Sequence, residues 1–286
     1  MNTARNIFIP FPRYENAIFI GDAVTQTLAV LRIYAKGLIG GELPNAETYY
    51  PYEKLVECTA CMMHDTRRLK IAVRRGEVDY VLLEDNGREK HALLSIKNDL
   101  ERSGIKVLVL DISQGALDAF KNAGELFGEE RRTQRAIAEY KACLNFVHEQ
   151  LPLVPRKGLV FLTIRHPVDD RIFLFALSDA AEINDGIFKP LNIETLVLEK
   201  DFKTVMPGLV EVNQPEDFIK FNPDFIAFCG DYLAGMLALN SAFKKMKGNR
   251  ISAIENHCIY PLPYYCDALS CRRPRIMQSW LQALTT

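Results

Sequence analysis

Asn222-Pro223-Asp224-Phe225-Ile226-Ala227-Phe228 is the stretch of this 286-residue chain that decides its fold. An acidic residue precedes a run of apolar residues without polar alternation, which is the pattern of a strand buried on both faces of a parallel sheet. Gly76-Glu77-Val78-Asp79-Tyr80-Val81-Leu82-Leu83 repeats this pattern in the first third of the chain. The sequence therefore predicts two similar α/β halves.

Length, composition and charge indicate a globular protein with two cores, because 286 residues exceed the usual size of a single core. Hydrophobic residues make up 48% and charged residues 25% of the chain, and no window approaches the roughly 20 uninterrupted apolar residues of a membrane span. The 35 basic and 36 acidic residues give a net charge of -1. We therefore expect no nucleic-acid partner and no membrane span.

The cysteines and the N-terminal residues bear on the compartment. Seven cysteines form an odd set without regular spacing, which argues against a disulfide framework and suits reduced thiols. The first ten residues, Met1 to Pro10, lack a charged n-region, a long apolar h-region and a small-residue cleavage site. A protein that truly starts at Met1 is expected in the cytoplasm, although a trimmed chain would look the same.

Residues 1–121 are expected to form an N-terminal lobe in which strands and helices alternate. This order implies right-handed crossovers and a parallel sheet covered by helices on both faces. The strands are predicted at 17–20, 38–40, 78–83 and 105–110, and the helices at 24–34, from about 65 to 75, and at 88–102.

Residues 122–151 are expected to form an interlobe helix. Between Glu129 and Leu151 there is no Gly or Pro, and apolar residues recur every three to four positions. Pro152 and Pro155 then end the helix. The C-terminal lobe, 152–286, is predicted to have strands at 158–164, 172–175, 195–198, 224–229 and 251–254, and helices at 179–191, 215–220, 233–247 and 274–284, the last with Trp280 buried.

Several segments together resemble a known family, the substrate-binding proteins of ABC importers for iron–siderophore complexes, haem and cobalamin, also called class III periplasmic binding proteins. None of these segments is catalytic, and they are specific as a set rather than singly. Those of the C-terminal lobe are 222–226, 240–251, and Arg273-Pro274-Arg275-Ile276-Met277 with Trp280-Leu281; those of the N-terminal lobe are 76–83, 103–107 and 126–130.

The resemblance implies two Rossmann-like lobes with parallel sheets, joined by one long helix and changing their relative angle only modestly on binding. It implies a monomer without intrinsic cofactor or catalytic residues, located in the periplasm or at the cell surface. Its ligand would be an iron or cobalt chelate (a ferric siderophore, haem or a corrinoid), held in the interlobe cleft and delivered to an ABC transporter permease. Sheet topology also favours the loops beyond the carboxyl ends of the strands as the ligand site.

In the N-terminal lobe the segment 58–64 is expected to be one of these loops. It contains two thiols, two thioethers and an imidazole, a soft-ligand set suited to Cu(I), haem iron or zinc. The alternative is that Cys61 and Met62 are buried packing residues and His64 is exposed to solvent. The candidate ligand contacts of this lobe are Tyr49, Tyr50, Cys61, Met62 and His64.

In the C-terminal lobe, Tyr264 or Tyr265 could flank a planar ligand, and Arg272 or Arg273 could meet carboxylates through two-pronged hydrogen bonds. The resemblance also implies an aromatic ligand contact at this loop. The alternative is that Arg273 pairs with a structural carboxylate and that Tyr260 is a core residue. The spacing of Cys229, Cys258, Cys266 and Cys271 does not match a zinc site. The candidate metal ligands of the whole chain are Cys58, Cys61, His64 and His257.

Two other functions stay open. One is a cytoplasmic metal or tetrapyrrole handling protein, a chelatase-like enzyme or a chaperone, on the same two-lobe architecture with Cys61, His64 or His257 as ligand. The other is a two-lobe glycosyltransferase, which would need a nucleotide-phosphate loop that the second lobe does not show. The sequence also lacks a Gly-x-Ser-x-Gly elbow, a Walker loop and a dinucleotide fingerprint after its first strand.

Overall fold

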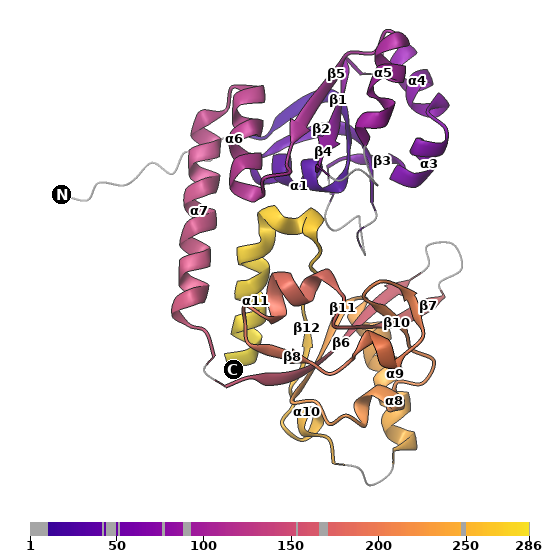
Figure 1. The fold of residues 1–286 in the computed structure, drawn as a ribbon, viewed down its shortest axis with the longest axis vertical. Helices are drawn as coiled ribbons and strands as arrows, with labels where there is room; N and C mark the ends of the chain where they lie inside the picture. The colour runs from indigo at the N-terminus through magenta and orange to yellow at the C-terminus, as the bar shows by residue number, and fades with distance from the viewer. Residues whose placement is uncertain are drawn as a thin grey trace, which may run out of the picture. The chain divides into compact units, whose positions relative to one another are not determined.

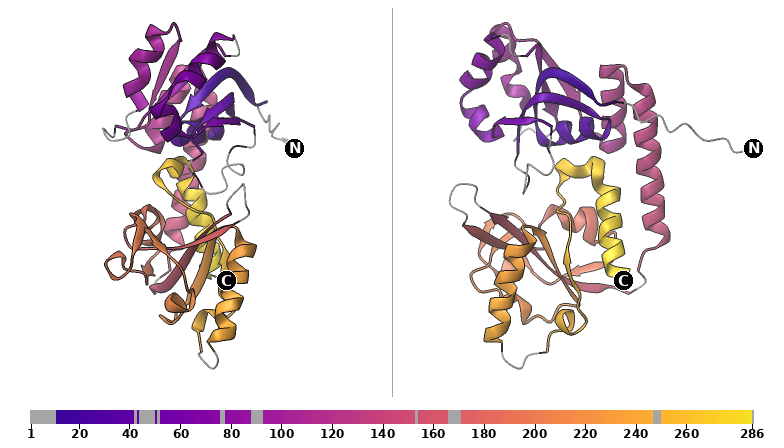
Figure 2. Two further views of the ribbon diagram at one scale, coloured as in Figure 1. Left: turned by 90° about the vertical axis from the view of Figure 1, so that its right-hand side faces the viewer. Right: turned by 180° about the vertical axis from the view of Figure 1, so that it is seen from behind.

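The computed structural model describes residues 11–41, 43, 50, 52–75, 78–87, 93–152, 154–165, 171–246 and 250–285. They form two α/β units (Figures 1 and 2), and the division falls between Ile137 and Ala138, except that Leu43 groups with the second unit. The expected α/β fold class is confirmed. No helix in these parts of the chain combines the length and the apolar character that crossing a membrane requires.

The sheet of the first unit has five parallel strands in the order β3-β2-β1-β4-β5. The chain adds strands to one side of β1 and then moves to its other side, so the topological switch point lies between β1 and β4. Ligands of open parallel sheets gather at this point. The strands are β1 (Arg13–Ile20), β2 (Ile33–Ile39), β3 (Lys54–Glu57), β4 (Tyr80–Asp85) and β5 (Val107–Asp111).

Helices cover both faces of this sheet (Figure 1). One face carries α1 (Asp22–Val30) and α6 (Ala116–Phe127); the other carries α3 (Thr59–His64), α4 (Arg67–Arg74), η2 (Leu93–Ile96) and α5 (Lys97–Arg102). Under this second group, Ile18 and Ile20 of β1 pack in one apolar cluster with Met62, Leu69 and Leu100. The long helix α7 (Glu130–Glu149) follows α6, and the division between the units falls within it.

The predicted helix over 24–34 is wrong in its second half. Helix α1 ends at Val30, and Arg32 takes a left-handed conformation with φ of 57° that breaks the helix. Ile33 and Tyr34 already belong to β2, where buried and less buried residues alternate. The apolar run spans the end of a helix and the start of a strand. The residues of these two elements together happen to show a helical spacing.

The second unit contains a mixed sheet in the order β12-β11-β6-β7-β10-β9, with β8 also paired to β6. Strands β11, β12 and β8 run parallel to their partners, whereas the β6–β7, β7–β10 and β10–β9 pairs are antiparallel. The expectation of a wholly parallel sheet is therefore wrong for the second unit. Its strands are β6 (Arg156–Arg165), β7 (Ile172–Leu177), β8 (Ile193–Thr195), β9 (Thr204–Met206), β10 (Leu209–Glu211), β11 (Phe225–Gly230) and β12 (Ile259–Pro261).

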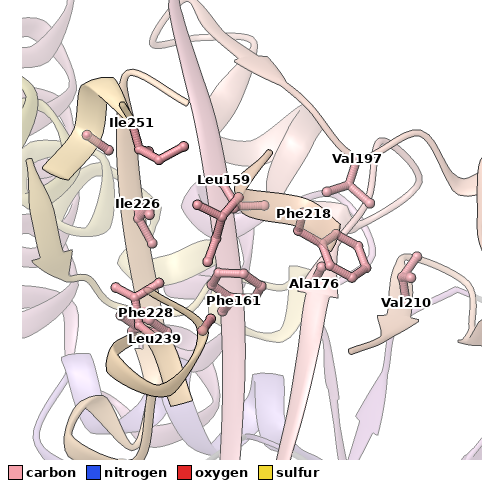
Figure 3. Packing of buried hydrophobic residues seen from close by; sticks show 13 residues of the cluster. Leu159, Phe161, Ala176, Val197, Val210, Phe218, Ile226, Phe228, Leu239 and Ile251 are labelled. Carbon is pink, nitrogen blue, oxygen red and sulfur yellow. The ribbon is translucent and has the colours of Figure 1, made fainter. Parts of the chain in front are cut away.

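Strand β11, which lies in the stretch 222–228 that decides the fold, supplies side chains to two cores because alternate residues face opposite sides of a sheet. Ile226 and Phe228 join the cluster shown in Figure 3, where the rings of Phe161 and Phe228 stack with centroids 5.5 Å apart. Phe225 instead faces Trp280, with centroids 6.4 Å apart. Trp280 is fully buried, as predicted.

The helical elements of the second unit include one wrongly predicted segment. Residues 251–254 were expected to be a strand, but Ile251 is the N-cap of helix α10 and residues 252–254 lie in it, and β12 is the strand that pairs with β11. Ile251 and Ala253 are buried in the same core, so their apolar character reflects packing of a short helix. The elements are η3 (Asn184–Phe188, a π-helical turn), η4 (Glu199–Asp201), α8 (Glu216–Ile219), α9 (Tyr232–Lys245), α10 (Ser252–Glu255), η5 (Asp267–Arg272) and α11 (Arg273–Thr285).

Candidate ligand-binding edges of the two units

At the switch point of the first unit, the carboxylate of Glu84 closes the start of α1. Glu84 lies near the carboxyl end of β4, and its Oε2 accepts hydrogen bonds from the backbone N–H groups of Ala23 (2.9 Å) and Val24 (3.1 Å). The side-chain amide of Asn86 donates to its Oε1 at 3.3 Å. Because a helix N-terminus attracts negative charge, the carboxylate is well placed there. Burial raises the pKa of Glu84, and the two backbone N–H groups oppose that shift.

Asp22 and Tyr50 form a second polar contact at this edge. Oδ1 of Asp22 accepts the backbone N–H of Gly41 at 2.9 Å and also the phenolic hydroxyl of Tyr50. Tyr50 is only 6% exposed. Its hydroxyl therefore already has a protein partner, and its role as a ligand contact stays a prediction. Tyr49 lies outside the residues that the structure describes.

The segment 58–64 was expected to be a loop, but it forms a short helix with Cys58 as its N-cap. Sγ of Cys58 accepts the backbone N–H of Cys61 at 3.3 Å. Met62 is fully buried in the core of the first unit, whereas Cys61 and His64 are exposed. The alternative interpretation thus holds for Met62 and His64, but not for Cys61.

The proximity of Cys58 affects the pKa of Cys61. A hydrogen bond with the Cys58 sulfur raises the pKa of Cys61, with smaller contributions that include the charge of Glu57. Within the described parts of the chain, no group of three or more His, Cys, Asp and Glu side chains is arranged to hold a metal ion. His257 is exposed in the second unit, just after α10. Metal ligation by Cys58, Cys61, His64 or His257 stays a prediction.

In the second unit, Tyr265 and Arg273 support the π-helical turn η3. Tyr265 is 4% exposed, and its ring lies so close to Gly186 that no side chain would fit there. Burial raises the pKa of the Tyr265 phenol. Nε of Arg273 donates to the carbonyl oxygen of Gly186 at 2.8 Å. The backbone of η3, rather than a carboxylate, is therefore the partner of this Arg273 nitrogen.

Arg272 and Tyr264 differ from Tyr265 and Arg273 in their surroundings, although all four residues follow strand β12. Nε of Arg272 is buried and finds no hydrogen-bond acceptor among the residues described. Tyr264 is half-buried. A buried donor without an acceptor is rare in proteins and calls for an explanation. Ligand contact by the four predicted residues of this segment stays a prediction.

No family model matches the chain, and no curated protein matches it. Solved structures do match. The periplasmic heme-binding protein BhuT, in complex with two hemes, is 13% identical with a TM-score of 0.62, covering 95% of this chain and 98% of that chain. The periplasmic heme-binding protein HutB of Vibrio cholerae is 15% identical with a TM-score of 0.58, covering 94% and 99%. An ABC transporter substrate-binding protein from Listeria monocytogenes EGD-e is 15% identical with a TM-score of 0.51, covering 94% and 98%.

The chain has the substrate-binding-protein fold of ABC importers. The resemblance drawn from the sequence is confirmed at this level. Residues 247–249 and 76–77, which belong to the segments that carried it, lie outside the described residues. The similar structures quoted are binding proteins by their own descriptions.

Within this substrate-binding-protein fold, carboxylates close two strand–helix turns that could otherwise bind phosphate. Glu84 occupies the start of α1 after β1. Asp231 caps α9 after β11, where its Oδ1 accepts the N–H of Ala234 at 3.0 Å. Phosphate binding at such turns uses the N–H groups of the helix start. These two turns therefore offer no support for the glycosyltransferase alternative.

Glu84 and Asp231 were not among the residues predicted from the sequence to be functional. The signal was present for Asp231, because an Asp directly after a buried strand and before a helical pattern is a typical N-cap. Glu84 caps a helix 61 positions away in sequence. Only the pairing of β1 with β4 brings the two together.

Proposed function

We propose that this protein binds a metal chelate with iron or cobalt at its centre and delivers it to the permease of an ABC importer. The observation that supports this most is the likeness along nearly the full length of both chains to a periplasmic heme-binding protein solved with its ligand. A match of that extent includes both units and the long helix α7.

Arg272 and Tyr264 are the proposed ligand contacts of the second unit. Haem carries carboxylates, and siderophores and corrinoids present carboxylate or amide oxygens that accept hydrogen bonds. The guanidinium group of Arg272 suits such acceptors, and its buried Nε has no acceptor among the described residues. The ring of Tyr264 would add apolar contact with a planar ligand.

In the first unit we propose Cys61 and His64 as candidate contacts, since both side chains are exposed on α3. Met62 and Tyr265 contribute to the cores of their units, with 0% and 4% of their surface exposed. A ligand could contact either side chain only after the core had opened. We therefore propose no ligand contact for these two residues.

We further infer that one copy of the chain carries one chelate outside the cytoplasm, which is where a protein that feeds an importer has to act. The proposal predicts saturable binding of at least one chelate class in solution. Isothermal titration calorimetry with hemin, cyanocobalamin and a ferric hydroxamate siderophore tests it. The variant Arg272→Ala then tests the proposed contact, and Arg275→Ala serves as its control.

A further inference from the structure

We propose that Cys58 and Cys61 are a redox-active dithiol that forms a reversible disulfide by exchange with low-molecular-weight disulfides. The two cysteines stand in the order Cys58-Thr59-Ala60-Cys61, with two residues between them. Cys58 lies in the turn between the edge strand β3 and helix α3, and Cys61 lies in the first turn of α3. A Cys-x-x-Cys pair at a strand–helix turn is the spacing that thiol–disulfide chemistry uses.

The local geometry places the two cysteines on the same turn at the start of α3. The N–H of Met62 donates to the carbonyl of Cys58 at 3.1 Å, so the two cysteines share one helical turn. Cys58 is the extended N-cap rather than a helical residue. A disulfide requires the two Cβ atoms to come within about 3.5–4.5 Å, so its formation would need the turn to close to that separation. The backbone N–H of Cys61 already donates to Sγ of Cys58 at 3.3 Å.

The pair is accessible, although the helix that carries Cys61 packs against the core of the first unit. Cys61 is exposed and Cys58 is half-buried, whereas Cys229 and Cys271 are buried. Met62 holds α3 in the core of the first unit. A disulfide would therefore close one surface turn without disturbing the sheet.

Cys58 is the expected attacking residue, because it is the N-cap of α3 and its sulfur accepts the backbone N–H of Cys61. The thiolate of Cys58 attacks one sulfur of a disulfide RSSR, and the S–S bond breaks to release RS⁻, which takes up a proton. Cys61 then loses its proton and attacks the sulfur of Cys58, releasing the second RSH. The protein dithiol is oxidised by two electrons, and RSSR is reduced to two RSH.

Incubation of the reduced full-length chain with oxidised and reduced glutathione, followed by alkylation and peptide mass spectrometry, tests the proposal. We expect a Cys58–Cys61 disulfide that dithiothreitol reverses, and we expect Cys61→Ser to accumulate a glutathione adduct at Cys58. Cys143→Ser, which removes a half-buried thiol elsewhere, should form the disulfide as the wild type does.

The proposal is overturned if both thiols of the wild type stay open to alkylation in oxidised glutathione, or if a stable glutathione adduct forms without resolving to the disulfide. Because these outcomes are read from the wild-type chain, they do not depend on the folding of any variant. The experiment uses no chelate, so its failure would leave the proposed chelate binding standing, although both proposals give a role to Cys61.

Discussion

Glu84 accepts a hydrogen bond from the backbone N–H of Ala23 at 2.9 Å, although the two residues are 61 positions apart in the chain. This bond joins the end of β4 to the start of α1 across the switch point of the first sheet. It gives that edge a fixed carboxylate instead of a phosphate-binding turn. The same carboxylate makes the stability of the first unit sensitive to substitution and to pH.

Replacement of Glu84 by alanine should lower the free energy of unfolding by about 1–3 kcal/mol, because the buried N–H groups of Ala23 and Val24 lose their acceptor. Urea denaturation followed by circular dichroism measures the change. Asp118→Ala is the matched control, since Asp118 is an exposed carboxylate whose partner is Lys121. The control should change stability by no more than about 0.5 kcal/mol. Equal losses in the two variants would contradict the capping role.

The pH dependence of stability should also report Glu84, since burial raises its pKa above the ordinary value of 4.5. The native state then binds the proton more tightly than the unfolded state, so this contribution is present below pH 4.5 and is lost as pH rises through the native pKa. Glu84→Gln cannot titrate. The stability of Glu84→Gln relative to the wild type should therefore rise with pH above 4.5, as urea midpoints at several pH values would show. Parallel profiles would rule the effect out.

Gly230, at the end of β11, should tolerate no side chain. It has φ of 93°, and a Cβ there would overlap the backbone carbonyl of Thr163. Gly104 has a similar φ of 80° but open space around it. We expect Gly104→Ala to cost about 1–2 kcal/mol from the backbone conformation alone, and Gly230→Ala to cost about 1–3 kcal/mol more. Thermal unfolding compares the two variants. Equal costs would contradict the prediction, because they would show that the end of β11 can move away from Thr163.

Arg272→Ala should weaken chelate binding about tenfold or more, because a hydrogen bond to a charged group is worth about 1.5–3 kcal/mol. Arg275→Ala is the control, since this exposed arginine pairs with Glu139 at 3.2 Å on the surface. Its affinity should match the wild type. The dissociation constants come from calorimetry, with circular dichroism to confirm that both variants fold. Equal affinities in all three proteins would remove Arg272 from the site.

The sequence predicted the fold class, and it did so best where an element is buried on both sides. Strand β11 and the final helix with Trp280 were predicted almost to their ends, because their apolar character comes from packing against two layers or one deep core. Errors arose where short elements meet. The helix over 24–34 and the strand over 251–254 were misjudged because a handful of apolar residues fits either period.

The candidate site was less predictable from sequence than the fold. The residue types at Tyr265 and Arg273 suggested ligand contacts, but both contact Gly186, a partner 79 to 87 positions away that only the folded chain reveals. The orphaned nitrogen of Arg272 is likewise a property of its surroundings rather than of its type. By contrast, the spacing of Cys58 and Cys61 was visible in the sequence, and the structure added the helical cap that gives it meaning.

Chelate binding by the wild-type protein is the central claim, and isothermal titration calorimetry with hemin, cyanocobalamin and a ferric hydroxamate siderophore tests it most directly. We predict saturable binding of at least one of these chelates at a stoichiometry near one, with a dissociation constant of about 1 µM or tighter, equivalent to about -8 kcal/mol. The absence of saturable binding for all three, in protein shown to be folded, would contradict it.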